Sequence, residues 1–590
     1  MGGINGIIRT GAAIEEAERA FIGVGQPLQV VAEGGGWALS ARTRSTLAVS
    51  DHFVVALAGH FDRAPGTGQS AAQILLETWE KYGIDALMRV EGAWVAAVYD
   101  RRQQRLHLLR DPFGIRRLCF VHKGGKLAFS TQARSLLELP WVSRELAREN
   151  LSEFLSFRYV HAPRTLLRDV QALPAGHHAE FRGNNLDLRP WYNLKYSPPY
   201  ARMPEDPANL EELERRMNRS VAARASGKER VGVFLSGGLD SSAITALASR
   251  LGKVHTFTVG VQDADDDEVP YAGRVANLLH TQHEVVRVAP ATYQESFEQI
   301  VRGFDFPVTD PAAIPQYLLA KAAKSSVDVI LAGDGGDEIF GGRMVGTVAA
   351  QLRLSTLLTK MPGPARRLAA GVFGKQRPEL HEPTMPVGLA RRIGGLQIFD
   401  REARATLIRD PGWVRPGIRR SCLEPFYREV VSDPINEILH AWLRGRMAED
   451  ALARSGAAAA LSGLALREPL LDRDLVSFCA GLPGSWKVRN GGPSGAVTKW
   501  PLREILRPIL GRALVNRPKR VLPGPWRRWF EGPLKHFKEE QAARLRQDQL
   551  RLFLPGAVDN LLARMAEPGT DVKVWTLIFL DAWLREIRAV

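Results

Sequence analysis

A short apolar strand that runs into a turn of glycine and serine and then into a helix most constrains the fold of this chain. The stretch reads VGVFLSGGLDSSAITALASRL, residues 231–251. Glycines let the backbone turn sharply and approach a phosphate, and the N-terminus of the next helix offers free N–H groups to an anion. The stretch therefore predicts a phosphate-binding loop at the carboxyl end of a buried strand.

The residues of this turn indicate which kind of phosphate loop it is. No lysine and no GxxxxGK[ST] pattern occur in the turn, which excludes a Walker A loop. Asp240 would repel phosphates unless it held Mg²⁺ between them, and hydroxyls on both sides add hydrogen-bond donors. The turn resembles the pyrophosphatase loop of enzymes that split ATP into AMP and pyrophosphate.

A second strand ends in an acidic loop. In DVILAGDGGDEIFGG, residues 328–342, the carboxylates Asp334, Asp337 and Glu338 follow the apolar VILA within a few residues. Such a cluster is repulsive without a cation. Because open parallel sheets bind ligands at the carboxyl ends of their strands, both loops are predicted to face one site.

Two domains are predicted for a chain of 590 residues. Residues 28–130 form short alternating apolar runs, typical of a mostly antiparallel sheet, with helices near 15–21 and 71–82. After residue 209, long helical segments alternate with short apolar strands, as in a parallel doubly wound sheet. The proline-rich stretch between them predicts the division 1–195, linker 196–208 and 209–590. Three glycines among residues 1–6, MGGING, disfavour a strand or helix at the terminus.

Composition excludes several functional classes. Three scattered cysteines offer neither a disulfide framework nor a CxxC site, and no export signal or membrane-spanning run is present. A net charge of +15 could favour anionic partners. No aromatic-studded RNA motif or zinc-finger spacing supports nucleic acid. We expect a cytoplasmic protein with no membrane or nucleic-acid partner.

Six matches in order, with the two loops counted as one, carry a resemblance to the asparagine synthetase family. Besides the two loops they are RDPFGIRRL, FLSFRYVHAPRTLLRDVQALPAGHHAEF, DFPVTDPAAIPQYLLA, REPLLDRDLVSFCAGLP, and TKWPLREIL with NRPKR. The resemblance implies an α+β sandwich of the N-terminal-nucleophile type. An α/β parallel-sheet synthetase domain of the adenine nucleotide hydrolase-like (PP-loop ATPase) type, with extra helices, follows it.

The resemblance also implies roles for residues that match the family motifs. Leu235 and Val259 resemble the contacts to the adenine of ATP, and Asp240 and Asp337 resemble ligands of Mg²⁺. Lys519 matches the lysine that neutralises charge during adenylate formation or aminolysis, and Asp334 and Glu338 are candidate catalytic groups. The implied pyrophosphate cradle consists of Ser236, Gly237, Gly238, Asp240, Ser241 and Ser242, and Gly333 is a further candidate residue for binding the nucleotide.

The first domain departs from the family where glutamine would be hydrolysed. Active members expose a cysteine at position 2 as the nucleophile, and here the residue is Gly2, which cannot form a thioester. Ala58-Gly59-His60 replaces Asn-Gly-Glu, and Glu91 replaces an aspartate. We therefore expect an inactive glutaminase domain that persists as a structural remnant.

The acyl pocket departs as well, and this bears on the substrate. Polar family positions are Ala457 to Leu461 here, Phe306 replaces a frequent glutamate, and Arg343 replaces an aromatic residue. Family members with these two departures include lasso peptide cyclases and β-lactam synthetases, which use an amine of the same molecule. We favour macrolactam closure of a precursor peptide, with a leader peptidase as a candidate partner. An ammonia-dependent asparagine synthetase-like enzyme, a β-lactam synthetase-like ligase and, least favoured, a non-catalytic scaffold are the alternatives.

Overall fold

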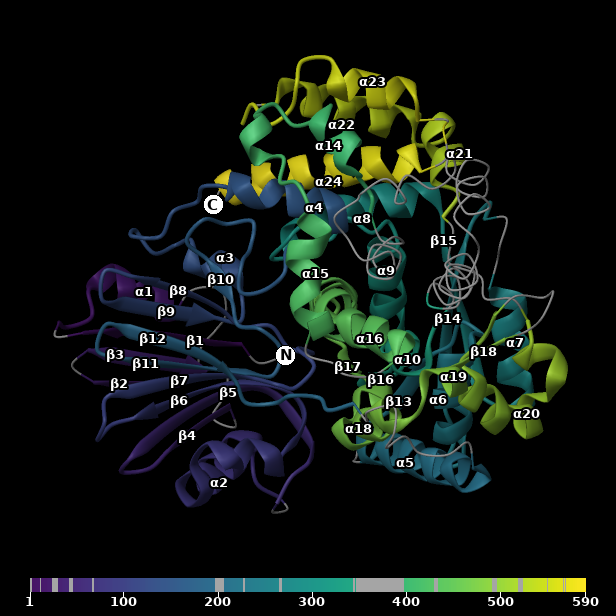
Figure 1. The fold of residues 1–590 in the computed structure, drawn as a ribbon, viewed down its shortest axis with the longest axis horizontal. Helices are drawn as coiled ribbons and strands as arrows, with labels where there is room; N and C mark the ends of the chain where they lie inside the picture. The colour runs from purple at the N-terminus through teal and green to yellow at the C-terminus, as the bar shows by residue number, and fades with distance from the viewer. Residues whose placement is uncertain are drawn as a thin grey trace, which may run out of the picture.

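A computed structural model shows two domains side by side, with the N-terminal sheets at the left and the helix-rich second domain at the right of Figure 1. The structure describes residues 3–10, 12–23, 30–34, 36–41, 46–65, 68–196, 206–226, 229–264, 268–342, 345, 397–428, 433–490, 496–517, 524–548, 550–565, 567 and 569–589.

Two six-stranded sheets and their helices form the N-terminal domain. Sheet A has the order β10 (Gln171–Ala172), β8 (Cys119–Lys123), β9 (Lys126–Ser130), β1 (Ile4–Arg9), β3 (Trp37–Ala41) and β2 (Val30–Gly34). Sheet B has the order β12 (Asn185–Pro190), β11 (His177–Arg182), β7 (Arg105–Arg110), β6 (Glu91–Asp100), β5 (Phe53–Arg63) and β4 (Leu47–Val49). The helical elements are α1 (Glu16–Gly23), α2 (Ala71–Tyr82), η2 (Gly83–Arg89), α3 (Ala133–Leu136), η3 (Arg148–Asn150) and α4 (Leu151–Phe157).

The two sheets pack face to face over an apolar core. Ile4, Leu39 and Phe129 of sheet A meet Val95 and Leu106 of sheet B in one buried cluster. Helix α1 packs on sheet A and α2 on sheet B, so the domain has four layers. Helices α1 and α2 match the two predicted for this region, and the predicted α+β sandwich is confirmed.

The glycine-rich terminus is a strand, which corrects the expectation from its composition. Strand β1 pairs with β3 on one side and β9 on the other. A Cβ on Gly6 would collide with the Phe129 ring and lie 2.7 Å from Leu39 Cδ2. The glycine that disfavours a strand in isolation is therefore the residue that lets this strand fit between its neighbours.

A five-stranded parallel sheet is the centre of the second domain, in the order β15 (Gln282–Val288), β14 (His255–Val261), β13 (Val231–Phe234), β16 (Val329–Leu331) and β17 (Ala465–Arg467). All four strand pairs are parallel, which confirms the predicted α/β architecture. The chain starts at β13, extends the sheet to β15 and returns to add β16 on the other side. The switch point between β13 and β16 is where such sheets bind ligands.

Helices surround this sheet and form a layer along the top of Figure 1. They and the remaining short elements are α5 (Pro207–Ala225), α6 (Leu239–Ser249), α7 (Val269–Leu278), α8 (Pro290–Gly303), α9 (Ala313–Ala323), α10 (Gly336–Phe340), α14 (Arg401–Ala405), η6 (Pro411–Trp413), α15 (Ile418–Arg428), α16 (Pro434–Ala441), the π-helix η7 (Trp442–Ala451), α17 (Leu452–Leu461), η8 (Pro469–Leu471), α18 (Arg473–Gly481), α19 (Gly484–Lys487), β18 (Val488–Asn490), β19 (Ala496–Thr498), α20 (Trp500–Val515), α21 (Trp526–Glu531), α22 (Lys535–Gln547), α23 (Ala557–Ala563) and α24 (Thr570–Ala589).

Strand β12 ends at Pro190 and α5 begins at Pro207, on either side of the predicted linker. Residues 197–205 of that linker, and residues 346–396, lie outside the described residues. The domain boundaries at 195 and 209 stay a proposal. Among the helices that the structure describes, none is long and apolar enough to span a membrane.

A buried network of charges joins the two domains. Arg224 of α5 lies 3.1 Å from Asp62 and 3.7 Å from Glu91, both in sheet B, and 3.2 Å from Asp472 before α18. Arg473 also faces Glu91, at 3.5 Å. Burial, together with the neighbouring Asp472, raises the pKa of Glu91 to about 7. Separating the domains would break the pairs of Asp62 and Glu91 with Arg224 and of Glu91 with Arg473, so the network holds the domains as one unit.

Candidate active site

The phosphate loop (residues 236–242, after β13) and the acidic loop (residues 333–338, after β16) lie against each other at the switch point. A Cβ on Gly333 would lie 2.9 Å from the Cβ of Asp240, and a Cβ on Gly336 would collide with the Asp240 carboxylate. The glycines of the acidic loop are thus required for this close approach. The structure brings the two loops to one place, as the sequence predicts.

Hydrogen bonds within the phosphate loop fix its shape. The Ser236 hydroxyl accepts from Gly238 N at 3.2 Å and lies 3.1 Å from the Ser241 hydroxyl. Gly237 has φ +67°, and a Cβ there would lie 2.7 Å from Ala272 N. Helix α6 begins within the loop, at Leu239, so its first N–H groups point toward the space in front of the loop.

Lys499 joins the two loops, and sequence analysis assigned it no role. Its ammonium group forms ion pairs with Asp240 and with Asp337 Oδ1, the latter at 2.5 Å. The residue is 2% exposed and has left-handed backbone angles (φ 56°, ψ 38°) just before α20. Burial alone would lower the pKa of Lys499, but the two carboxylates outweigh it and raise that pKa. A cation therefore sits between the two predicted Mg²⁺ ligands.

Two further carboxylates of the acidic loop have raised pKa values. Burial, reinforced by Asp337, raises the pKa of Glu338 to about 7, although Arg446 lies 3.8 Å away. Burial also raises the pKa of Asp334 against the opposing influence of Arg454. Glu338 can therefore accept or release a proton near neutral pH.

Arg517 holds the phosphate loop from the far end of α20. Its guanidinium donates to the carbonyl of Gly237 at 3.0 Å and to that of Ser236 at 3.3 Å. Lys519, two residues further on, lies outside the described residues, as do Gly2 and Arg343. The charge-neutralising role of Lys519 stays a prediction.

The predicted adenine contacts lie on adjacent strands. Leu235 follows β13, where its N–H donates to the Phe257 carbonyl at 2.9 Å and its carbonyl accepts from the Thr258 hydroxyl. Val259 is on β14 and is partly buried. Both main-chain groups of Leu235 are already in hydrogen bonds, so contact with adenine through this residue stays a prediction.

The residues of the two loops fit a magnesium–phosphate group. Within the part of the chain that the structure describes, Asp240 Oδ1 and Ser242 Oγ are buried and make no hydrogen bond. Buried oxygens without partners are costly unless a ligand satisfies them. Carboxylate and hydroxyl oxygens are the ligands that Mg²⁺ prefers, and the free N–H groups at the start of a helix donate hydrogen bonds to phosphate.

A cavity of about 580 Å³ lies between the domains. Its second-domain wall includes Phe306 and, on α17, Ala457, Ala460 and Leu461. These are positions where the sequence departs from the family acyl pocket. The N-terminal wall includes Gly3, Gly59 and His60, so the cavity reaches the beginning of β1.

His60 and Glu91, two altered positions of the predicted glutamine pocket, have different surroundings. His60 lines the cavity, and its Nε2 lies 3.2 Å from Asp62 Oδ1. Burial lowers the pKa of His60, so the imidazole is neutral at neutral pH. Glu91 belongs instead to the charge network between the domains.

Comparison with known proteins identifies both domains. Residues 212–585 match the asparagine synthase family, and residues 62–192 match a glutamine amidotransferase domain. A putative glutamine-hydrolyzing asparagine synthetase of Mycobacterium tuberculosis is 30% identical over 483 residues, which cover 78% of this chain and 71% of that one. Glutamine-hydrolyzing asparagine synthetase 1 of Bacillus subtilis is 27% identical over 87% of this chain and 80% of its own. The protein named amidase chyE of Penicillium rubens is 24% identical over 80% and 75%. The chain thus belongs to the asparagine synthase family and is an ATP-dependent carbon–nitrogen ligase of that family.

Proposed function

We propose that this ligase adenylates an Asp or Glu side chain of a precursor peptide and closes a macrolactam with the peptide's N-terminal amine. The observation that carries the proposal is the cavity of about 580 Å³, where Ala457, Ala460 and Leu461 replace polar positions of the family. A cavity lined by small apolar side chains suits an extended acyl substrate better than free aspartate, which has a charged amino group and a charged carboxylate to bind.

Two bond changes make up the proposed reaction. A carboxylate oxygen attacks the α-phosphorus of ATP, and the bond to pyrophosphate breaks to leave an acyl adenylate. The amine nitrogen then attacks the acyl carbon, AMP leaves, and the amine loses a proton. Because the amine belongs to the same molecule, its effective concentration is high.

Named residues have proposed roles in these steps. Ser236 to Ser242 hold the pyrophosphate, and Asp240 and Asp337 hold Mg²⁺. When bound, the ion supplies positive charge that stabilises the departing pyrophosphate. Lys499 keeps the two carboxylates together, and Glu338, with its pKa of about 7, takes up the proton that the amine loses.

The nitrogen source is the second part of the proposal. Gly2 has no side chain that could attack the carboxamide of glutamine, so thioester chemistry at position 2 is excluded. His60 and Ala58 replace the carboxylate and amide expected to bind glutamine. We infer that the N-terminal domain is inactive as a glutaminase and that a cytoplasmic peptide supplies both reacting groups.

An ammonia-dependent asparagine synthetase-like enzyme is the second candidate. The names of the Mycobacterium and Bacillus relatives favour the asparagine synthetase part of this candidate, although both names specify glutamine hydrolysis. The acidic loop and NRPKR, which stay close to the family pattern, favour it as well. That enzyme would bind a small carboxylic acid in the cavity and use free ammonia.

Pyrophosphate exchange and product mass separate the two candidates. Purified full-length protein, ATP and Mg²⁺ are incubated with peptides that have a free N-terminus and an internal Asp or Glu, or with aspartate and isotopically labelled ammonium. Macrocyclisation predicts exchange that depends on the peptide and a product that has lost one water without gaining label. Labelled asparagine would refute the cyclase, and no exchange with any carboxylate would refute adenylation. N-terminally acetylated peptide is the matched control, because it keeps the carboxylate but blocks ring closure.

A further inference from the structure

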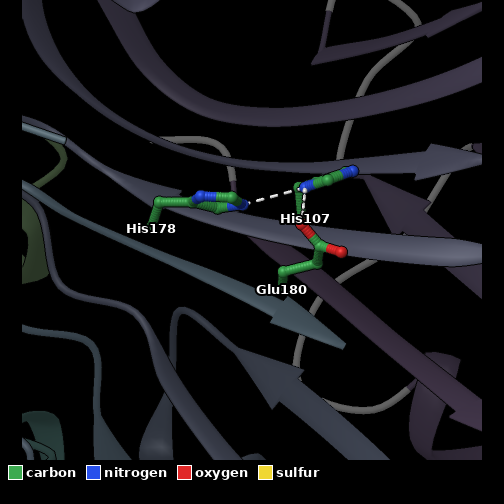
Figure 2. Close-up of side chains that lie close together, drawn as sticks. All are labelled: His107, His178 and Glu180. Atoms are coloured by element: carbon green, nitrogen blue, oxygen red, sulfur yellow. Dashed lines mark hydrogen bonds and ion pairs between the residues drawn. The ribbon is translucent and has the colours of Figure 1, made fainter. Parts of the chain in front are cut away.

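Three metal-ligating side chains meet on the N-terminal domain, away from the two loops. His107, His178 and Glu180 point toward one another in Figure 2. They come from β7 and β11, on the face of sheet B that α2 covers, because the Trp79 ring of α2 lies 5.2 Å from the His107 ring. His178 and Glu180 lie at the end of the motif that closes in AGHHAEF, but the proposed reaction uses none of the three side chains.

Strand register places the three side chains together. Strands β7 and β11 are antiparallel, and Glu180 lies directly opposite His107. His178 is two residues before Glu180 on the same strand, so both project from the same face. The cluster therefore depends on two neighbouring strands of one sheet, which gives it a rigid base.

The distances suit a small metal ion. His107 Nδ1 lies 2.8 Å from His178 Nε2 and 4.0 Å from Glu180 Oε2, and the three ligand atoms lie within 4.8 Å of one another. Ligands at the Zn²⁺ bond length on a tetrahedral ion are about 3.3 Å apart. One observed distance is shorter and the other longer than that value, so a shift of the Glu180 side chain toward the rings, with a small separation of the two rings, completes the set.

Glu180 can make this shift at little cost. Its side chain is 30% exposed and pairs with Arg105 at 3.3 Å, and Arg105 is 27% exposed. Such partly exposed pairs contribute little to stability and rearrange easily. The histidines are more fixed, since their rings stack with centroids 5.0 Å apart.

The protonation states of the histidines and the types of ligand also favour a metal site. Burial lowers the pKa of both imidazoles to about 4, so a metal ion meets neutral ring nitrogens at neutral pH. Two imidazoles and one carboxylate form a three-ligand set that Zn²⁺ binds well, with water in the fourth position. The alternative is a hydrogen bond between the two neutral rings without a metal.

We propose that His107, His178 and Glu180 form a Zn²⁺ site that links the β11–β12 hairpin to β7. Strand β12 is the edge of sheet B, so the ion would tie an edge hairpin to the body of the sheet. The site is independent of ATP and of the proposed peptide chemistry.

Metal binding to the full-length protein tests the proposal. Protein stripped with a chelator is titrated with Zn²⁺ by calorimetry, and Co²⁺ is added separately to record its visible ligand-field bands. Wild type should bind one Zn²⁺ at this site and give the bands of a four-coordinate ion. His178→Ala should weaken binding at least about 100-fold, since even a group that only orients a ligand contributes 10–100-fold. Glu180→Gln, on a partly exposed side chain that folding tolerates, should weaken it about 10-fold or more.

Two control variants make the result specific. His52→Ala removes a histidine of the same domain that lies outside the cluster and should leave binding unchanged. Cys422→Ala removes a ligand of the second compact group of metal-binding side chains, Glu153, His161 and Cys422, and should also leave it unchanged. No Zn²⁺ bound by wild type, equal affinity in His178→Ala, or binding lost in Cys422→Ala would each overturn the proposal.

Discussion

Replacing Lys499 by methionine would test how the two loops are held together. In the structure the buried ammonium lies between Asp240 and Asp337. Lys499→Met keeps most of the side-chain volume and removes the charge. Two carboxylates would then face each other with no cation between them.

The structure gives a magnitude for this loss. Removing one partner of a buried ion pair costs about 3–5 kcal/mol. The Asp240 and Asp337 side chains are 17% and 32% exposed, which places the loss toward the lower end of that range. A large domain loses about 2 °C of thermal midpoint per kcal/mol. The midpoint of the second domain should therefore fall by roughly 6–10 °C in the presence of a chelator.

Added Mg²⁺ should restore most of the loss, since a divalent ion takes the place of the missing ammonium. Differential scanning fluorimetry of variant and wild type, each with chelator or with Mg²⁺, measures both effects. Asp337→Asn in the same background should recover part of the midpoint, because one of the two facing carboxylate charges is gone.

The matched control is Lys324→Met. Lys324 also faces an aspartate, Asp328 at 3.9 Å, but both side chains are 41% exposed. Its loss should cost less than about 1 kcal/mol. A Lys499→Met midpoint at the wild-type value, or a fall that Mg²⁺ does not reverse, would refute the account of Lys499 as the cation between the loops.

Four further substitutions, with Gly273→Ala as a control for the last, probe the site, the terminus, the domain interface and the packing of β1. Asp240→Asn should abolish ATP–pyrophosphate exchange with an unchanged circular dichroism spectrum, and near-normal exchange would contradict its assignment to Mg²⁺. Gly2→Ala should leave exchange at the wild-type rate, whereas a large loss would give the terminus a role in synthesis. The folded pKa of Glu91, about 7, lies above its ordinary 4.5, so its contribution to stability is present below pH 4.5 and lost as pH rises through 7. Glu91→Gln should therefore weaken the dependence of the thermal midpoint on pH between 4.5 and 7. Parallel curves of midpoint against pH for variant and wild type would contradict the raised pKa of Glu91. Gly6→Ala places a methyl group inside the packed sheets and should cost about 1–3 kcal/mol by thermal melting, while Gly273→Ala, which meets nothing within 4 Å, should be neutral.

The local elements were largely readable from the sequence. Apolar alternation over β5 and β6, and the helical pattern of α1 and α2, arise from neighbours along the chain. The strand β13 and the turn SGGLDSS that follows it were also predicted from residues that are neighbours along the chain. Strand β1 was misread because the packing of Gly6 against Phe129 joins distant segments, which no local propensity describes.

The contacts that the sequence did not predict join residues that are far apart along the chain. Lys499 reaches Asp240 across 259 positions of sequence, and its motif TKWPLREIL gives no sign of the partner. The pairing of His107 with Glu180 depends on strand register, which a single sequence does not specify. Contacts of this kind appear only when the fold is known.

The buried charges between the domains also bear on how the protein can evolve. Arg224 of the second domain is neutralised by Asp62 and Glu91 of the first as well as by Asp472. A chain truncated to its synthetase half would expose this surface and leave the arginine with fewer counter-charges. Selection for a foldable synthetase is therefore sufficient to retain the N-terminal domain, with or without glutamine chemistry.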